Sequence, residues 1–561
     1  MAYLWGMIAS IRIIALSLGL MAVSAASNGQ QTVGTFLNTP EAFDGYTLLA
    51  PLSSTTTWLI NNCGEVIHTW ESVSKPGLAA YLLEDGTLLR TGKADSDVFS
   101  GGGMGGYLEI LDWESNVLWS HTFATPTLHS HHDVEPMPNG NILVIAWEAK
   151  DSTEAIASGI NPLNIGETGI WPSVILEIEP VGTNEINTVW EWHLWDHLVQ
   201  DFDAEKPGFG TVADHPELMD INFHANGGSP GPGPGGGEDW IHLNAVDYHA
   251  ELDQIVVSSR NISEIYIIDH STTTEEAAGH TGGMYGKGGD FLYRWGNPQA
   301  YDHGGPADQQ FGGQHDSRWI ESGFPGEGGI MVFNNDGTFA AQSSVDVIYP
   351  PQDSPGVYTA SGEDGYLPSE VAWTWTDETF FSSYISGAER LSNGNTIICE
   401  GASGTLWEVD LDGNVVWQYI NPVSQGQILE QGQAVGENAV FRIARYSADY
   451  DGLQGVDLTP GNPIELNPFG YACELYPENP QAVRELEALV YVSPNPFAEW
   501  LNIELINDAQ ISILTPDGRV LESMFLQTGS HRWSATHLPN GVYLLSAVDG
   551  YSRSVHRLIH Y

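Results

Sequence analysis

Several polar residues whose side chains could handle an anion stand at corresponding places in a repeated sequence pattern. His132, His242 and His315 each lie shortly before a β-like run that contains Ile142, Ile255 or Ile330. Asn244 follows His242 by two residues. Arg260 comes directly after the run that follows that histidine. In an antiparallel pair, Arg260 would lie beside His242 and Asn244.

This set of side chains is typical of a site for a tetrahedral oxyanion. Neutral histidines can also hold a metal, but a guanidinium beside a divalent cation is unfavourable and no carboxylate takes the equivalent position. Asp133 and Asp316 directly follow their histidines and should point to the other side of the strand. We therefore predict no metal and no cofactor here. Imidazole, amide and guanidinium groups suit the transfer of a sulfuryl or phosphoryl group, with histidine as nucleophile.

A recurring strand pair must position these residues. The first strand of the pair follows an N-G or D-G turn in DGTLLRTG (85–92), NGNILVIAW (139–147) and NGNTIICEG (393–401). Helical periodicity is scarce. About six such units predict an all-β fold, a six-bladed β-propeller over residues 27–478, whereas a flat β-sandwich is the alternative. In a propeller, the aligned histidines and Ser386 of the last unit would meet around one axis.

Ring closure would come from the end of the propeller. VFRIARY (440–446) and YACELYP (471–477) are expected to pair with the first blade. The chain has three cysteines, which allow one disulfide and leave one thiol. This closure would allow a bridge between Cys63 and Cys473.

Composition and the N-terminus indicate an exported protein. The chain has 561 residues, and its formal net charge of −54 disfavours nucleic acid and anionic lipid as partners. Arg12, an apolar run and small residues predict a signal peptide over residues 1–26, with an uncleaved membrane anchor as the alternative. No other stretch is apolar enough to span a bilayer, so the mature chain is predicted to lack a transmembrane segment.

The sequence pattern changes after a predicted linker at residues 479–489. Short alternating strands around P-D-G and P-N-G turns predict a small β-sandwich over residues 490–561. SPNPF (493–497) and LPNGVYLL (538–545) resemble the C-terminal sorting domain of the type IX secretion system. The resemblance implies the secretion machinery as a partner and an extracellular or outer-membrane location. His560 and Tyr561 depart from the usual lysine-ended tail.

The propeller segments HHDVEPMPNGNIL, DWIHLNAVDYHAELDQIVVSSRN and QHDSRWIESGFPGEGGIMVFNN resemble the bacterial arylsulfotransferase family. Enzymes of this family are six-bladed propellers that move a sulfuryl group between phenols without a nucleotide sulfate. The resemblance implies that His315 is the transiently sulfated nucleophile. It also implies that His242, Asn244 and Arg260 bind the sulfuryl oxygens and protonate the leaving phenol, and it places His132 in the same site.

Two departures and two alternatives accompany this resemblance. Ser386 is the candidate for the hydroxyl residue that the family adds late in the propeller, and Asp316 replaces a small or hydroxyl residue after the nucleophile. A small phenolic donor and acceptor are the expected substrates. The alternatives are a sulfatase-like hydrolase or lyase that uses the same residues, and a non-catalytic exported propeller that only binds a glycan or protein.

Overall fold

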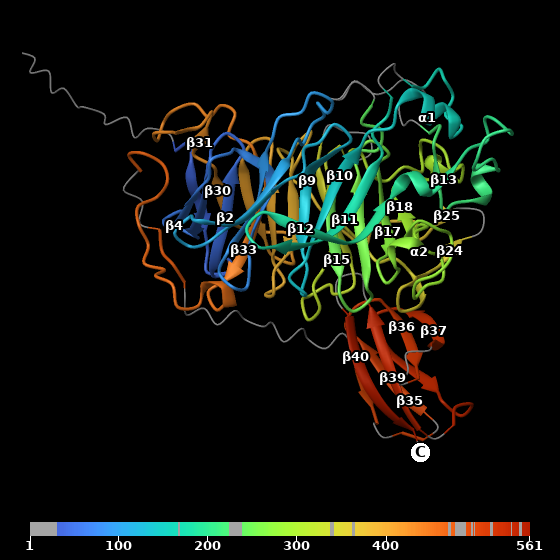
Figure 1. The fold of residues 1–561 in the computed structure, drawn as a ribbon. Coiled ribbons are helices and arrows are strands. Elements are labelled where there is room, and N and C mark those ends of the chain that lie inside the picture. The colour runs from blue at the N-terminus through green and yellow to red at the C-terminus, as the bar shows by residue number, and fades with distance from the viewer. Residues whose placement is uncertain are drawn as a thin grey trace, which may run out of the picture.

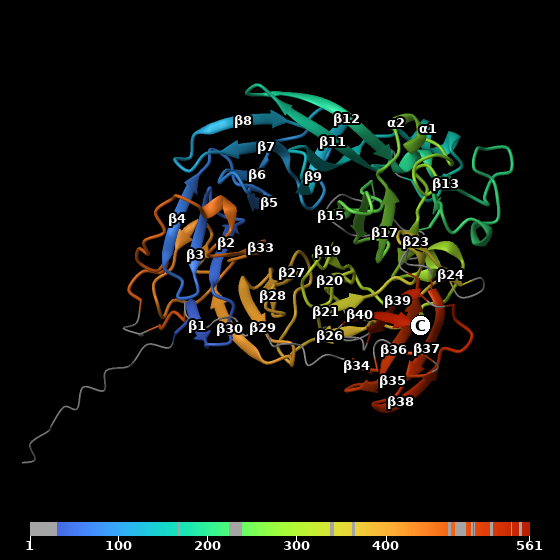
Figure 2. The ribbon, with the colours of Figure 1, turned by 90° about the horizontal axis from the view of Figure 1, so that it is seen from below.

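The structure is a computed structural model. It describes residues 31–165, 169–223, 238–336, 342–361, 365–468, 473–476, 490–494, 497–498, 500–515, 520–539, 541–548 and 553–560. The predicted signal peptide and linker lie outside these residues. Within them the chain is almost entirely β, and most sheets stand around one axis (Figure 2). The predicted all-β propeller is confirmed, whereas its blade count stays a prediction.

The sheets of the N-terminal half follow one another along the chain, each ordered from the axis outward. They are β5 (Pro76–Leu82), β6 (Leu88–Lys93), β7 (Gly106–Leu111) and β8 (Val117–Thr122); β9 (Leu128–Pro136), β10 (Ile142–Glu148), β11 (Ser173–Val181) and β12 (Glu185–His193); and β15 (Leu243–His249), β16 (Gln254–Ser259), β17 (Glu264–Asp269) and β18 (Tyr293–Trp295). The turns between first and second strands carry Gly86 and Gly140 at φ +83° and +86°, the left-handed conformation that an N-G or D-G turn needs.

The remaining propeller sheets include both ends of the ring. They are β19 (His315–Trp319), β20 (Ile330–Asn334), β21 (Ser344–Ile348) and β26 (Trp373–Trp375); β27 (Gly387–Arg390), β28 (Thr396–Glu400), β29 (Thr405–Val409), β30 (Val415–Ile420) and β1 (Gly34–Asn38); and β33 (Val440–Ser447), β2 (Gly45–Pro51), β3 (Thr56–Asn61) and β4 (Val66–Glu71). The late strand β33 pairs antiparallel with the early strand β2, as predicted from VFRIARY. The N-terminal strand β1 in turn completes the sheet of β27–β30, a pairing that the sequence did not predict.

Short elements decorate this frame (Figure 1). They are the helices α1 (Ser152–Ala157) and α2 (Thr274–Ala277), the 3-10 turns η1 (Leu194–Asp196), η2 (Val212–Asp214), η3 (Pro298–Tyr301) and η4 (Asp451–Leu453), and the short strands β13 (Leu198–Val199), β14 (Met219–Asp220), β22 (Gln352–Ser354), β23 (Val357–Tyr358), β24 (Ala360–Ser361), β25 (Gly365–Tyr366), β31 (Val423–Ser424) and β32 (Gln427–Ile428). No helix among the described residues is long and apolar enough to cross a bilayer.

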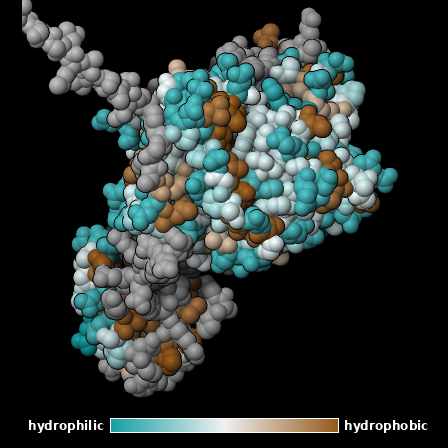
Figure 3. Space-filling model, turned by 90° about the vertical axis from the view of Figure 1, so that its left-hand side faces the viewer, coloured by the Kyte–Doolittle hydropathy of each residue, from teal (hydrophilic) through white to brown (hydrophobic). Residues whose placement is uncertain are grey.

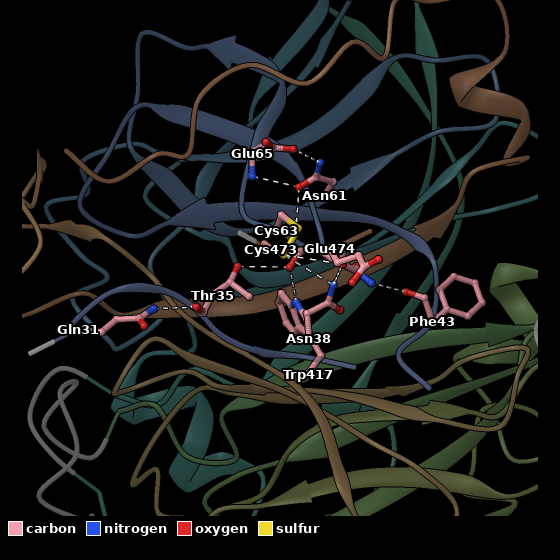
Figure 4. Close-up of a disulfide and its surroundings, with 11 residues drawn as sticks. Gln31, Thr35, Asn38, Phe43, Asn61, Cys63, Glu65, Trp417, Cys473 and Glu474 are labelled. Carbon is pink, nitrogen blue, oxygen red and sulfur yellow. Dashed lines mark hydrogen bonds between the residues drawn. A yellow bond between two sulfur atoms is a disulfide. The ribbon is translucent and has the colours of Figure 1, made fainter. Parts of the chain in front are cut away.

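A disulfide between Cys63 and Cys473 confirms the predicted bridge (Figure 4). It joins the β3–β4 turn to the segment that follows the propeller, across a sequence separation of 410 residues. Asn38 of β1 donates a hydrogen bond of 2.8 Å to the carbonyl oxygen of Glu474 beside it. Cys399 is the remaining thiol and is buried. Of the second predicted closing segment, YACELYP, residues 473–476 are described and form no strand.

The C-terminal residues form two sheets around their own apolar core. The sheets are β34 (Val490–Ser493), β35 (Trp500–Leu505) and β38 (Gly529–Ser534), and β37 (Val520–Leu526), β36 (Ala509–Leu514), β39 (Gly541–Val548) and β40 (Arg553–His560). Alternating residues such as Leu501, Ile503, Ile511 and Ile513 are fully buried between them. This is the predicted small β-sandwich.

The surface agrees with the acidic composition. The face in Figure 3 is mostly hydrophilic or neutral, with hydrophobic residues in small separate groups. A net charge of −54 on such a surface favours solubility and repels polyanions.

Candidate functional site

The innermost strands bring the predicted site residues to one side of the axis. Successive innermost strands β5, β9, β15, β19 and β27 contact one another, and β27 contacts β33. His132 lies in β9, His242 directly precedes β15, and His315 begins β19. Strands far apart in sequence therefore present their histidines to a common region.

A backbone irregularity recurs where these strands meet the site. His132, His242 and Asp316 have φ of +54°, +50° and +54°, and Ser386 has φ of +92°. Register shifts accompany them in the pairings of β9, β15 and β19 with their neighbours. A bulge turns a side chain away from the regular alternation, and left-handed non-glycine residues cost of order 1–3 kcal/mol each. The same local distortion thus aims the site residues in three adjacent sheets.

His132 and His242 are in direct contact. Their ring centroids are 4.5 Å apart at an interplanar angle of 74°, and both side chains are buried. His131 Nδ1 lies 2.9 Å from His132 Nδ1, so one proton is shared between those rings. Burial, followed by the neighbouring rings of His242 and His131, lowers the pKa of His132 well below 6.5. His132 is therefore neutral at pH 7.

His242 is held by a carboxylate that the sequence did not single out. Asp239 accepts a hydrogen bond from His242 Nδ1, and its other oxygen accepts one of 2.8 Å from the indole of Trp147. The carboxylate keeps the proton on Nδ1 and leaves Nε2 for proton exchange. The only signal in the sequence is the acidic residue three positions before His242.

His315 is oriented by Asn335, a second residue that sequence reasoning missed. Asn335 Nδ2 donates 2.8 Å hydrogen bonds to the carbonyls of Ser382 and Ile385, which fixes the amide. Its Oδ1 then faces His315 Nδ1 at 2.7 Å and accepts from it. The proton of His315 is thereby placed on Nδ1, and the lone pair on Nε2. Asn335 directly follows β20 as Arg260 directly follows β16, and this equivalence was the available signal.

The electrostatic surroundings keep His315 neutral. Burial lowers its pKa well below 6.5, and Arg260 and His242 lower it further against the opposing effect of Asn335. Nε2 accepts a long 3.2 Å hydrogen bond from the backbone N–H of Ile385. A neutral imidazole with Nε2 weakly engaged is a competent nucleophile.

Arg260 lies where the strand pairing predicted. Its backbone N–H donates to the carbonyl of His242 at 3.1 Å, and its side chain runs close to Gly313, two residues before His315. Within the described residues, its guanidinium makes one hydrogen bond, at 3.3 Å to Asn261 Oδ1. The other N–H groups of this half-buried cation are available to an anion.

The remaining two predicted residues, Asn244 and Ser386, differ in whether they keep a hydrogen-bonding atom for a substrate. Asn244 is fully buried, donates to the carbonyl of Gln314 at 2.7 Å, and has an Oδ1 without a hydrogen-bond partner in the described part of the chain. Ser386 is also fully buried, but its hydroxyl donates to Ser382 Oγ at 2.8 Å and accepts from the N–H of Gly401 at 2.9 Å. Ser386 is therefore engaged in holding the turn beside His315.

The two aspartates next to the histidines bind the innermost strands together. Asp133 accepts from the N–H of Val246 at 3.1 Å, and Asp316 accepts from that of Ala388 at 2.9 Å, each on the next innermost strand. Arg442 of β33 pairs with both carboxylates, at 2.8 and 3.2 Å. Backbone N–H groups on the innermost strands need such partners, so the two aspartates contribute to holding adjacent sheets together.

Comparison with known protein families gives two matches. Residues 115–443 match the sequence profile of a family described as arylsulfotransferase (ASST). Residues 490–560 match a secretion system C-terminal sorting domain, which indicates export to the cell surface or the medium. No curated protein sequence matches the chain.

Three solved structures have a distant likeness to the chain. A protein of unknown function from Bacteroides caccae is 12% identical with a TM-score of 0.38, over 72% of this chain and 98% of that one. The β-propeller domain of Cps50 (Swd1) from Myceliophteria thermophila is 11% identical with a TM-score of 0.34, over 76% and 96%. Virginiamycin B lyase from Staphylococcus aureus is 10% identical with a TM-score of 0.31, over 70% and 89%. At these values the likenesses carry no argument about function.

Proposed function

The chain belongs to the arylsulfotransferase family, and from this membership we propose that it moves a sulfuryl group from an aryl sulfate ester to a phenol through a sulfated His315. The observation that carries the proposal is the state of His315. The ring is buried, its pKa is well below 6.5, and Asn335 holds its proton on Nδ1. Neither a nucleotide sulfate nor a metal takes part in the proposed reaction.

The first step forms a nitrogen–sulfur bond. His315 Nε2 gives up its long hydrogen bond to Ile385 and attacks sulfur, while the bond from sulfur to the aryl oxygen breaks and its electron pair leaves with that oxygen. His242 donates the proton that the departing phenolate takes up, and Asp239 supplies a countercharge while the ring is doubly protonated. In-line displacement of this kind depends on positioning and on stabilising the equatorial oxygens.

Three side chains are proposed to bind those oxygens. The guanidinium of Arg260 supplies positive charge and several N–H donors, while His132 and the amide of Asn244 supply neutral donors. In the second step, the phenol oxygen attacks sulfur, the nitrogen–sulfur bond breaks, and the phenol proton passes to His242.

The test is an assay with 4-nitrophenyl sulfate and phenol, joined to mass analysis of the quenched protein. The wild type should release 4-nitrophenolate only at the rate at which phenyl sulfate forms, and a peptide that contains His315 should gain one sulfuryl group when no acceptor is present. His315→Ala should abolish both signals. His249→Ala, at the far end of β15, should abolish neither.

Wild-type turnover in His315→Ala would contradict the proposal. Repeated release of 4-nitrophenolate without phenol, beyond the one equivalent that sulfates His315, would favour a hydrolase that uses water. Absence of any reaction together with a correct fold would favour a binding module.

A further inference from the structure

Three potential metal ligands meet at a place that shares no residue with the candidate site. His197 follows η1 at the end of β12, whereas His280 and Asp290 lie in the segment between α2 and β18. The donor atoms of the three side chains all lie within 4.8 Å of one another. The Nδ1 atoms of His197 and His280 are each 2.8 Å from the same oxygen, Oδ1 of Asp290.

The hydrogen bonds of His197 determine which of its nitrogens can act as a ligand. Nε2 lies 2.8 Å from the carbonyl oxygen of Ala277, and because a carbonyl only accepts, Nε2 must carry a proton. In the neutral ring, Nδ1 then presents a lone pair to the carboxylate of Asp290. A lone pair on His197 Nδ1 and the carboxylate oxygen repel each other, so this pair requires a positive charge between them, which is either a proton or a metal ion. His280 Nδ1 approaches the same oxygen and can contact the same cation.

The surroundings hold two of the three ligands rigidly. His197 has a fully buried side chain, and Asp290 is 7% exposed. The ring of Trp192 is parallel to that of His197 within 4°, at a centroid distance of 5.5 Å. Gly289 makes this packing possible, because a Cβ there would come 2.6 Å from His197 Nε2.

We propose that His197 Nδ1, His280 Nδ1 and the Asp290 carboxylate bind a divalent transition metal of the Zn²⁺ class. Two imidazoles and one carboxylate form a ligand set that Zn²⁺ accepts, whereas Mg²⁺ and Ca²⁺ prefer oxygen ligands throughout. The bond from His197 Nε2 to a backbone carbonyl is the outer contact that metal-bound histidines commonly make. His280 is 60% exposed, so water can take the fourth position.

The bound ion would fasten one part of the chain to another. His197 continues from the outermost strand of the β9–β12 sheet, and the other two ligands lie in an insertion of the β15–β18 sheet. Figure 2 shows α2 and β12 as neighbours at the outer edge of the ring. The site would therefore be a structural staple between adjacent sheets, independent of sulfuryl transfer.

The test measures Zn²⁺ binding to the full-length protein after treatment with a chelator. The wild type should take up one equivalent more than His280→Ala or Asp290→Asn. In the variants, affinity at this site should fall at least about 10-fold, since even an outer contact is worth that much. The exposed position of His280 keeps its variant folded. His215→Ala, which removes a half-exposed histidine from another histidine–carboxylate pair, is the matched control and should bind as the wild type does.

Two further readouts make the outcome decisive. Co²⁺ in place of Zn²⁺ should give the visible absorption of a four-coordinate site in the wild type and in His215→Ala, and lose it in His280→Ala. Zn²⁺ should raise the Tm of the same two proteins only. Equal Zn²⁺ uptake by the wild type and His280→Ala, or no uptake by either, would show that a proton occupies the site and would overturn the proposal.

Discussion

The orientation of His315 rests on a single amide. Asn335→Asp still offers an acceptor to Nδ1 but cannot donate to the carbonyls of Ser382 and Ile385. The added negative charge should raise the pKa of His315. We expect the acid limb of kcat/KM to move to higher pH in Asn335→Asp. Asn335→Ala should lower kcat about 10–100-fold, as loss of an outer contact commonly does. If Asn335→Asp loses rate without any shift of its pH profile, Asn335 has a structural role only.

The low pKa of His315 has a consequence for the wild type. Because burial holds this pKa well below 6.5, the ring stays unprotonated as the pH falls through 6.5. The nucleophile should therefore remain active there, and kcat/KM with 4-nitrophenyl sulfate should decline only at clearly lower pH. A profile measured from pH 8 downward, with half the activity already lost at pH 6.5, would contradict this expectation.

One loop glycine controls the space available to a site histidine. A Cβ on Gly103 would come 2.0 Å from the ring of His132, whereas a Cβ on Gly140 would meet nothing within 4 Å. Both glycines have a left-handed φ, so alanine should cost each position similar strain. We expect Gly103→Ala to lower kcat by about 100-fold or more, as the loss of one oxyanion donor does, and Gly140→Ala to leave it unchanged. Similar kcat values for the two variants would show that the position of His132 does not matter.

At the scale of the strands, Arg442 is the charged link across the axis. It joins β33 to β9 through Asp133 and to β19 through Asp316. Arg442→Met would leave the buried Asp133 without its cation and Asp316 with Arg318 alone, and it should lower the free energy of unfolding by about 3–5 kcal/mol. Denaturant unfolding measures this. If the pairs are responsible, the double variant Arg442→Met with Asp133→Asn should lose less than the sum of the single losses.

At the scale of the whole molecule, the disulfide joins the segment that follows β33 to the β3–β4 turn near the start of the chain. Cys63→Ser should lower the free energy of unfolding by about 2–5 kcal/mol, and reductant should lower the Tm of the wild type but not of this variant. Cys399→Ser removes the buried free thiol and is the control. Its Tm should still respond to reductant.

The sequence predicted features that depend on residues close together in the chain, and it failed to predict several contacts between distant strands. N-G and D-G turns and strand periodicity predicted the repeats, and the equivalent places of His132, His242 and His315 followed from them. Asn335 was missed because it acts on a histidine of the neighbouring strand. Asp239 was missed because an acidic residue three positions before a histidine is too common a pattern to indicate a contact. The link through Arg442 was also missed, since it exists only when three sheets face one axis. The pairing of β1 with β30 was missed as well, because no hairpin turn connects these two strands in the sequence.

The pairing of β2 with β33 also determines when the propeller can finish folding. Until Val440–Ser447 is available, the sheet that begins at Gly45 has an uncovered inner edge with unsatisfied backbone groups. Contacts that wait for nearly the whole polypeptide form slowly, and an open edge meanwhile invites pairing with another chain. A nascent chain that stops short of Val440 should therefore be prone to aggregate, whatever the quality of its other sheets.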